Sequence, residues 1–166
     1  MPIPGIVQPE ILCISPSLRL RRYDGVHDFA FGWYQDPELV WLVDGVKRPY
    51  SPEKLAGMYR WLNDHGELYF IEVLENDGFV PVGDVTFWQQ DMPIVIGEPR
   101  WRGRGIGLQV ITALMDRGRE LGYRQLRVNE IYHYNTASRR CFEKAGFRVT
   151  EETESGVSLS WPPEQE

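Results

Sequence analysis

The chain has few of the residues from which disulfide frameworks and metal centres are built. Its 166 residues include 2 cysteines, Cys13 and Cys141, which are far apart and form no CxxC pair, and 3 isolated histidines. This usage argues against a disulfide scaffold and a zinc site, and it indicates a reducing compartment. We therefore expect no metal.

Long apolar runs are also missing. No stretch reaches the roughly 20 consecutive apolar residues that a membrane-spanning helix needs. Residues 1–5 lack the basic and apolar regions of a signal peptide. We expect a cytoplasmic protein that has no membrane partner.

Positive charge is in deficit. The chain has 18 Lys and Arg against 24 Asp and Glu, a net charge of -6. This balance does not suit nucleic acid. It suits a cationic substrate, and it equally suits a surface selected only for solubility. Because 42% of the residues are hydrophobic and 25% charged, we predict one soluble globular domain over residues 1–166.

Hydrophobic periodicity and turn residues predict a mixed order of strands and helices. Residues 1–16 are rich in proline and are expected to be irregular, and 24–41 is aromatic and partly helical. The predicted strands are 18–23, 68–74, 80–88, 92–97, 125–132, 147–152 and 157–161. The predicted helices are 51–66, with Ser51 as its N-cap, the segment from the glycines near 105 to 121, and 135–145. The second of these has an apolar stripe formed by Val110, Ile111, Leu114 and Leu121. This order indicates an α/β (α+β mixed) fold.

Three alternating glycines, Gly103, Gly105 and Gly107, lead directly into one of these helices. Glycine allows backbone N–H groups to face a ligand with no Cβ in the way, and a helix start adds its positive dipole end. Arg102 and Arg104 lie within the same loop. The loop is therefore a candidate cradle for a phosphate or pyrophosphate, and its structural alternative is a glycine turn that begins a helix.

The spacing of the glycines discriminates between the known types of phosphate-binding loop. A P-loop would need Gly-Lys-Ser/Thr, which the chain lacks, and a dinucleotide fingerprint would need glycine where Leu108 stands. The pattern that fits is [Q/R]-x-x-G-x-G, filled by Arg102, Gly105 and Gly107. A dinucleotide enzyme is accordingly disfavoured.

A second motif follows one helix and one strand later: Asn135 begins a segment that ends in Glu-Lys-Ala-Gly-Phe at 143–147. With both motifs in this order, the chain resembles the GNAT superfamily of acetyl-CoA-dependent N-acetyltransferases, most closely over residues 80–150. Residues 135–147 look similar to aminoglycoside N-acetyltransferases. The resemblance implies a central, mostly antiparallel sheet with two splayed parallel strands flanked by helices. It also implies acetyl-CoA as cosubstrate, an amine acceptor, and a monomer or homodimer.

The resemblance further implies an acetyl-CoA site within 80–150. Its loop residues, whose backbone would wrap the pyrophosphate, are Arg102, Gly103, Arg104, Gly105, Ile106 and Gly107. Its strand residues, which would pair with the pantetheine arm, are Val95, Ile96 and Gly97. An N–H near Gly97 would polarise the thioester carbonyl. The amide of Asn135 would bind the arm, cap its own helix, or do both.

Acetyl transfer to an amine needs a base, because an ammonium has no lone pair. Strand alternation places Glu130 on the face of Leu126 and Val128, where desolvation would suit it to this role. In ribosomal-protein acetyltransferases of the superfamily the base is a Glu five positions before the matching Asn, as Glu130 is. The alternative for Glu130 is an inward charge paired to an arginine. Glu98, at the end of the splayed strand, is the second candidate.

One position departs from the family pattern. Where many members have a Tyr that protonates the leaving thiolate, this chain has Phe142, which cannot donate a proton. Tyr132 and Tyr134 are possible donors, and the thiolate could also leave unassisted. Cys141 shares a helix stripe with alanines, which indicates a core position. This departure keeps open a non-catalytic module that only binds CoA.

The acceptor site is expected in the N-terminal half. Its candidates combine tryptophans and carboxylates, which suit a cationic amine or sugar, although each tryptophan could instead be core: Trp33, Asp36, Trp41, Asp44 and Trp88. We expect direct acetyl transfer in a ternary complex to a small cationic amine such as an aminoglycoside or polyamine. The alternative acceptor is a protein N-terminus.

Overall fold

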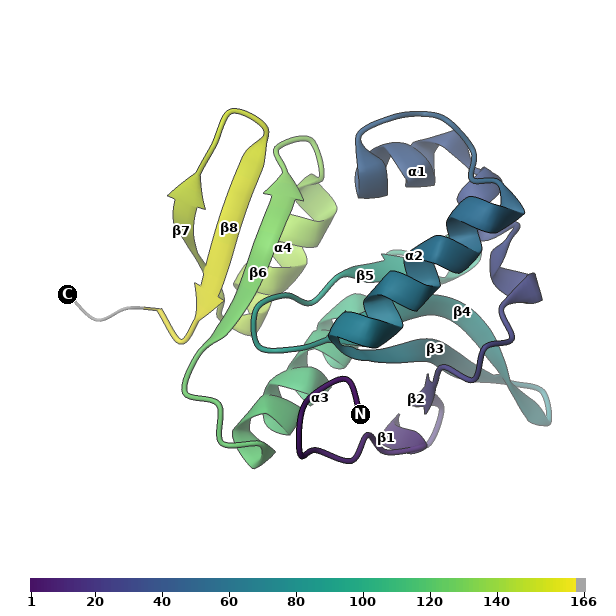
Figure 1. Ribbon diagram of the computed structural model, residues 1–166, viewed down its shortest axis with the longest axis horizontal. Coiled ribbons are helices and arrows are strands. Elements are labelled where there is room, and N and C mark those ends of the chain that lie inside the picture. Colours follow the sequence, from purple (N-terminus) through teal and green to yellow (C-terminus); the bar gives the residue numbers. More distant parts are fainter. Residues whose placement is uncertain (164–166) are drawn as a thin grey trace. The chain divides into compact units, whose positions relative to one another are not determined.

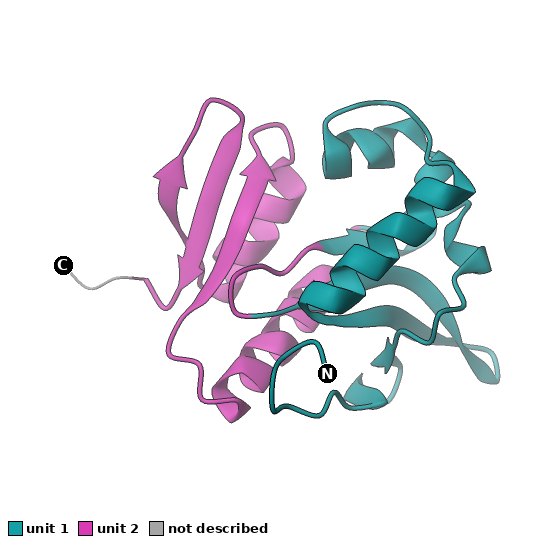
Figure 2. Ribbon diagram, in the orientation of Figure 1, with its two compact units in different colours: residues 1–88, 94–102 teal, residues 89–93, 103–166 magenta. Residues whose placement is uncertain are grey.

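Contacts within the chain separate it into two units, each with one sheet and its own helices (Figure 2). The computed structural model describes residues 1–163. Unit 1 consists of residues 1–88 and 94–102, and unit 2 consists of residues 89–93 together with those from 103 onward. The last three residues of the expected domain 1–166 lie outside the described part of the chain.

Unit 1 is built on a sheet of five strands in the order β1-β2-β3-β4-β5 (Figure 1). The strands are β1 (Ile11–Ser15), β2 (Leu18–Arg22), β3 (Glu67–Glu75), β4 (Gly78–Phe87) and β5 (Ile94–Ile96). Every neighbouring pair is antiparallel. Strand β1 lies inside segment 1–16, so the expectation that this segment is irregular was wrong for residues 11–15, whose backbone pairs antiparallel with β2.

The helices of unit 1 are α1 (Pro37–Asp44) and α2 (Pro52–His65), with short 3-10 turns η1 (Asp28–Ala30), η2 (Trp33–Gln35) and η3 (Pro99–Trp101). Ser51 accepts a hydrogen bond from the N–H of Lys54, so the predicted cap of α2 is confirmed. Buried side chains of η2, α1, α2 and β3 form one cluster, whose larger members are Trp33, Tyr34, Leu39, Leu55, Tyr59 and Phe70.

A buried carboxylate lies beside this cluster. Asp84 of β4 is 3% exposed, and its Oδ2 accepts hydrogen bonds from the hydroxyls of Tyr34 at 2.7 Å and Tyr59 at 2.8 Å. Burial raises the pKa of Asp84 to about 6, although both hydroxyl bonds act in the opposite direction. The carboxylate therefore joins η2 and α2 to the sheet.

Unit 2 has a three-stranded antiparallel sheet in the order β6-β8-β7. Its strands are β6 (Leu126–Tyr132), β7 (Arg148–Glu152) and β8 (Gly156–Trp161), and its helices are α3 (Ile106–Glu120) and α4 (Thr136–Ala145). The apolar stripe predicted for α3 is buried, as Val110, Ile111 and Leu114 show. Gly146 ends α4 with a left-handed φ of 115°.

The expected fold class, a mixed α and β architecture with mostly antiparallel pairing, is confirmed. Strand β5 is shorter than the predicted 92–97 and pairs with β4, while β6 pairs with β8. Among the described residues, no helix has the length and apolar character needed to cross a bilayer.

Candidate active site

The end of β5 in unit 1 is held by hydrogen bonds to β4. The N–H groups of Gly97 and Glu98 both donate to the carbonyl of Val82, at 2.8 and 3.1 Å. Since N–H directions alternate along an antiparallel strand, the N–H of Ile96 points to the other edge of β5. The N–H expected near Gly97 to polarise a carbonyl is therefore not that of Gly97, which is occupied; the candidate is Ile96.

Glu98 lies two residues beyond the end of β5 and is partly buried. Its Oε1 accepts a hydrogen bond from the indole Nε1 of Trp33 at 2.8 Å. Trp33 is 4% exposed, and its ring lies against the backbone of Gly97. For Trp33 the sequence left open contact with the acceptor or a core position; the side chain lies in the core and touches the candidate base Glu98.

Arg102, the first residue of the glycine motif, directs its guanidinium back to β5. Nε donates to the carbonyl of Ile96 at 2.8 Å and Nη2 to that of Gly97 at 3.3 Å. Nη1 lies 3.9 Å from Oδ2 of Asp36. The side chain therefore satisfies the carbonyls that leave the strand, a role that the sequence pattern did not reveal.

The other acceptor candidates do not form one group. Asp36 caps α1 by accepting from the N–H of Glu38, and Asp44 is paired with Lys54 at 2.9 Å. Trp41 lies on α1 with Lys47 5.8 Å from its ring centroid. Trp88 instead packs edge-on to Trp61, with ring centroids 6.2 Å apart. Each of these candidates already has a structural partner.

Unit 2 carries the glycine loop. Gly103 and Gly105 have φ values of 71° and 79°, a left-handed backbone that glycine adopts readily, and a Cβ at either would meet nothing within 4 Å. Helix α3 begins at Ile106 without a side-chain cap. Its first N–H groups have no acceptor within the helix. Open space and free donors at a helix start fit a pyrophosphate group.

The next residues of the motif pack against α4. A Cβ on Gly107 would lie 3.2 Å from the sulfur of Cys141, so glycine allows the start of α3 to approach α4. Cys141 is only partly buried, so the predicted core position was wrong, although the burial that it has raises the pKa of its thiol. The side chain of Arg104 lies on the exposed part of the loop.

Asn135 is the N-cap of α4. Its side-chain oxygen accepts from the N–H of Ser138 at 3.3 Å, so the capping role left open by the sequence is confirmed. That contact uses only the amide oxygen, and the two amide hydrogens take no part in it. The alternative role in binding the pantetheine arm stays a prediction.

Glu130 is not on the buried face that strand alternation predicted. The pairing of β6 with β8 shifts register between Val128 and Ile131, and the bulge turns Glu130 outward, where it is exposed. Its Oε1 accepts from the hydroxyl of Ser155 at 2.6 Å. The expected burial of Glu130 was therefore wrong, and the structure pairs its carboxylate with Ser155, not with an arginine as in the alternative interpretation.

The position that departs from the family pattern is a core position. Phe142 is 1% exposed and packs edge-on to Phe147. Tyr132 and Tyr134 stack with ring centroids 5.3 Å apart just before Asn135. Either tyrosine stays a candidate proton donor.

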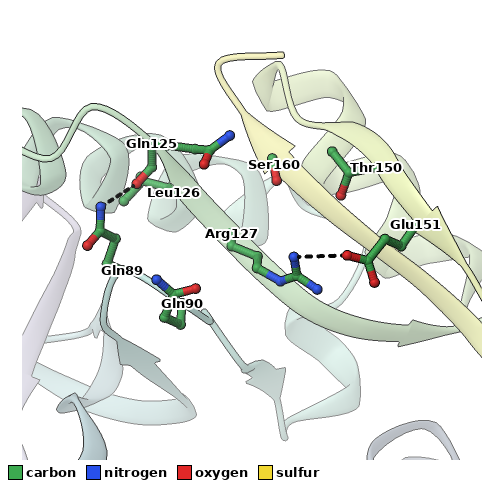
Figure 3. A pocket seen from close by; sticks show the side chains of 8 residues that line it. All are labelled: Gln89, Gln90, Gln125, Leu126, Arg127, Thr150, Glu151 and Ser160. Atoms are coloured by element: carbon green, nitrogen blue, oxygen red, sulfur yellow. Dashed lines mark hydrogen bonds and ion pairs between the residues drawn. The ribbon is translucent and has the colours of Figure 1, made fainter. Parts of the chain in front are cut away.

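A polar pocket of about 260 Å³ in unit 2 lies apart from these residues (Figure 3). Its lining residues are Gln89, Gln90, Gln125, Leu126, Arg127, Thr150, Glu151 and Ser160. Arg127 and Glu151 form an ion pair at 3.4 Å, and Gln89 donates to the carbonyl of Gln125. None of the predicted site residues lines this pocket.

Asp91 lies in the segment before β5 and is partly buried. Its Oδ1 accepts from the N–H groups of Met92 at 2.9 Å and Asn129 at 3.0 Å, which ties the segment before β5 to β6 within unit 2. Burial raises the pKa of Asp91 against these bonds and the nearby Arg127. Within residues 1–163, no group of three His, Cys, Asp or Glu side chains is arranged to hold a metal ion.

Comparison with known proteins identifies the family. A model of the GNAT acetyltransferase domain matches residues 17–148. The "N-acetyltransferase 9-like protein" of Nematostella vectensis is 30% identical over 170 residues, which cover 89% of this chain and 83% of that protein.

Solved structures agree in fold. A ribosomal alpha-N-protein acetyltransferase in complex with coenzyme A has a TM-score of 0.70 at 19% identity and covers 91% of this chain and 97% of its own. An aminoglycoside acetyltransferase in complex with coenzyme A has a TM-score of 0.67 at 16% identity, with coverage of 87% and 94%. These identities establish a shared fold, whereas the family match and the curated relative establish membership: this chain belongs to the GNAT family and is an N-acetyltransferase.

Proposed function

We propose that this protein transfers the acetyl group of acetyl-CoA to the primary amine of a small cationic acceptor, such as an aminoglycoside or polyamine, directly within a ternary complex. The observation that carries the proposal is the position of Glu98. Its carboxylate is held at the end of β5, two residues beyond the Ile96 N–H that faces the free edge of that strand.

Candidate acetyl-CoA-binding residues occur in both units. In unit 2, the backbone of residues 103–107 binds the pyrophosphate at the start of α3, and the amide hydrogens of Asn135 bind the pantetheine arm. In unit 1, the candidates for pairing with a pantetheine arm are the strand residues Val95, Ile96 and Gly97, of which Ile96 directs its N–H away from β4. Acetyl-CoA supplies the acetyl thioester, whose carbonyl carbon accepts the amine lone pair as the thiolate leaves.

The chain's own groups then act on protons and charge. Glu98 takes a proton from the acceptor ammonium, directly or through one water, which exposes the lone pair. The N–H of Ile96 donates to the carbonyl oxygen as negative charge develops on it. Glu130 is the second candidate base, at the same distance before Asn135 as in ribosomal-protein acetyltransferases. Tyr132 or Tyr134 would protonate the leaving thiolate, since Phe142 cannot.

The acceptor class rests on chemistry in unit 1. Glu98 and Asp36 are carboxylates on two neighbouring turns, and such groups attract an ammonium ion. The protein carries a net charge of -6, which also favours a cation. The fold relative that acts on aminoglycosides is consistent with this class.

A protein N-terminus is the second candidate acceptor, and one observation favours it. Leu42, Val43 and Val46, at the end of α1 and just after it, are exposed apolar side chains, 36% to 48% accessible. Apolar surface suits the side chains of a peptide better than it suits a polycationic sugar. A ribosomal alpha-N-protein acetyltransferase is also among the fold relatives.

A single assay separates the two candidates. Thiol release from acetyl-CoA would be measured against kanamycin, spermidine, free amino acids, and peptides whose N-terminal residue is varied. Turnover with kanamycin or spermidine alone supports the small cation. Turnover with peptides alone moves the assignment to a protein N-terminus, and no turnover with any of them would overturn the proposal.

A further inference from the structure

The side chain of Trp33 is packed tightly against the end of β5. It is 4% exposed, and its ring atoms lie 2.3 Å from the point that a Cβ on Gly97 would occupy. No other residue fits at 97 without moving the indole. Glycine at position 97 therefore allows the indole of Trp33 to pack against the backbone just after β5.

The indole has one polar atom, and that atom is used. Nε1 donates to Oε1 of Glu98 at 2.8 Å, and an indole N–H has no second way to be satisfied in an apolar site. A buried donor without a partner is costly, so this bond selects one position of the carboxylate. Oε2 of Glu98 is left outside this bond and is the oxygen that can take a proton.

A second contact joins the same two turns. Glu98 and Arg102 are the residues immediately before and after η3, while Trp33 begins η2 and Asp36 follows it. Trp33 meets Glu98, and Asp36 lies 3.9 Å from Arg102. The two short turns are thus linked near both of their ends, although residues 33–36 and 98–102 are far apart in the sequence.

The arrangement combines rigidity with exposure. The indole is buried in the core cluster, whereas Glu98 is only partly buried and lies beyond β5, the last strand of its sheet. Small misplacement of a reacting group lowers rates strongly. The side chain of Glu98 is long and flexible, so a hydrogen bond to a fixed, buried partner improves its positioning as a base.

We propose that Trp33 is a positioning residue for acetyl transfer: its buried indole N–H holds the Glu98 carboxylate in place for proton transfer, and the Arg102–Asp36 pair keeps the two turns together. The inference rests on the proposed function, in which Glu98 is the base. In this inference Trp33 affects the reaction through Glu98 and does not contact the acceptor.

The first test concerns the contact itself and needs no acceptor. In protein labelled with ¹⁵N-tryptophan, the six indole N–H signals are recorded, and the signal lost in Trp33→Phe is that of Trp33. We expect Glu98→Gln to move this signal more than the other five, because an amide oxygen is a weaker acceptor than a carboxylate. An unmoved Trp33 signal would overturn the inference.

The second test is a double-mutant cycle in kcat, measured with acetyl-CoA and each of kanamycin, spermidine and a serine-initiated peptide. Trp33→Phe keeps an aromatic ring and removes the N–H. We expect it to lower kcat by about 10- to 100-fold with little change in the KM for acetyl-CoA. In the Glu98→Gln background the same change should have no further effect, because residues that act through one group are not additive.

The cycle distinguishes positioning from a general loss of packing. Leu55→Ala opens the same core cluster away from Glu98 and should leave kcat unchanged at a temperature where the protein is folded. If Trp33→Phe lowers kcat by the same factor with and without Glu98, Trp33 acts only through the fold and the inference fails.

Glu98→Asp provides a second variant, should Trp33→Phe not fold. The shorter side chain keeps the carboxylate but cannot both reach the indole and keep Oε2 in place, so kcat should fall by about tenfold or more. Full activity of Glu98→Asp would contradict the inference. Full activity of Glu98→Gln would instead refute the proposed base, and the positioning role would fall with it, whatever the indole signal showed.

Discussion

The hydroxyl of Tyr59 donates a hydrogen bond of 2.8 Å to Asp84 inside unit 1, across 25 residues of sequence. Tyr34 donates to the same oxygen, and burial raises the pKa of the carboxyl to about 6 from an ordinary 3.8. Burial and the neighbouring Asp84 also raise the pKa of both tyrosines, so the two hydroxyls stay protonated donors. This cluster makes the stability of the protein depend on pH.

Asp84→Asn is predicted to become relatively more stable as pH rises. A carboxyl whose pKa is raised by folding stabilises the protein fully below pH 3.8, and that contribution is lost as pH rises through about 6. The shift corresponds to roughly 3 kcal/mol. Asparagine does not titrate and still accepts from both tyrosines. Urea unfolding at pH 4 and pH 7 measures the difference in the free energy of unfolding between variant and wild type. From pH 4 to pH 7 this difference should shift in favour of the asparagine variant.

The control for this prediction is Asp77→Asn, which changes an exposed carboxylate in the turn between β3 and β4. Its stability difference from wild type should stay nearly flat over the same range. A flat difference for Asp84→Asn as well would mean that Asp84 is not desolvated in solution.

Replacing each candidate base by glutamine is predicted to show which of the two carboxylates acts in catalysis. Glu98→Gln should lower kcat by about 100-fold or more, the range typical of a lost general base, while binding of acetyl-CoA is kept. Glu130→Gln changes an exposed side chain bonded to Ser155 and should alter kcat little. Steady-state kinetics with the best acceptor of the panel measures both. The opposite ranking would assign the base to Glu130.

Two substitutions of Asn135 are predicted to divide its roles. Aspartate caps a helix as well as asparagine does, so Asn135→Asp should keep the stability of α4 while it removes the amide donors. Asn135→Ala removes the cap and should cost about 1 kcal/mol. If the amide binds the pantetheine arm, both variants raise the dissociation constant for acetyl-CoA in calorimetry. Wild-type affinity in Asn135→Asp would leave Asn135 as a cap only.

Gly105→Ala is predicted to weaken binding of acetyl-CoA. The φ of 79° at Gly105 is left-handed, and a Cβ there costs about 1–2 kcal/mol. Release of that strain displaces the loop, and 1.4 kcal/mol is about tenfold in affinity. Gly57→Ala is the matched control: it lies within α2 with nothing within 4 Å, and it should stabilise by about 0.5–1 kcal/mol. Equal affinities for the two variants would contradict a role of the loop in binding.

Local features of the site could be predicted because each depends on a short stretch of chain. The glycine loop at 103–107 leads into a helix as its position in the sequence predicted, and Ser51 and Asn135 cap the helices that they precede. Turns, caps and apolar stripes are set by neighbours three or four residues away, so the sequence displays them directly.

The predicted alternation of buried and exposed side chains failed in β6, where the pairing with β8 shifts register. Glu130 was expected to face inward with Leu126 and Val128, but the bulge that follows Val128 exposes it. The position of a bulge depends on the partner strand, which here is β8. That strand begins at Gly156, 26 residues after Glu130. No periodicity within β6 could reveal it.

The sequence by itself determined the family, the glycine loop, the caps of α2 and α4 and the positions of most strands along the chain, because local backbone preferences and motif spacing carry that information. Only the tertiary structure decided that Trp33 is buried against Gly97 and bonded to Glu98, that Arg102 turns back to β5, and that Asp84 is shared by two tyrosines. These contacts join residues 6 to 65 positions apart, and packing alone selects such partners.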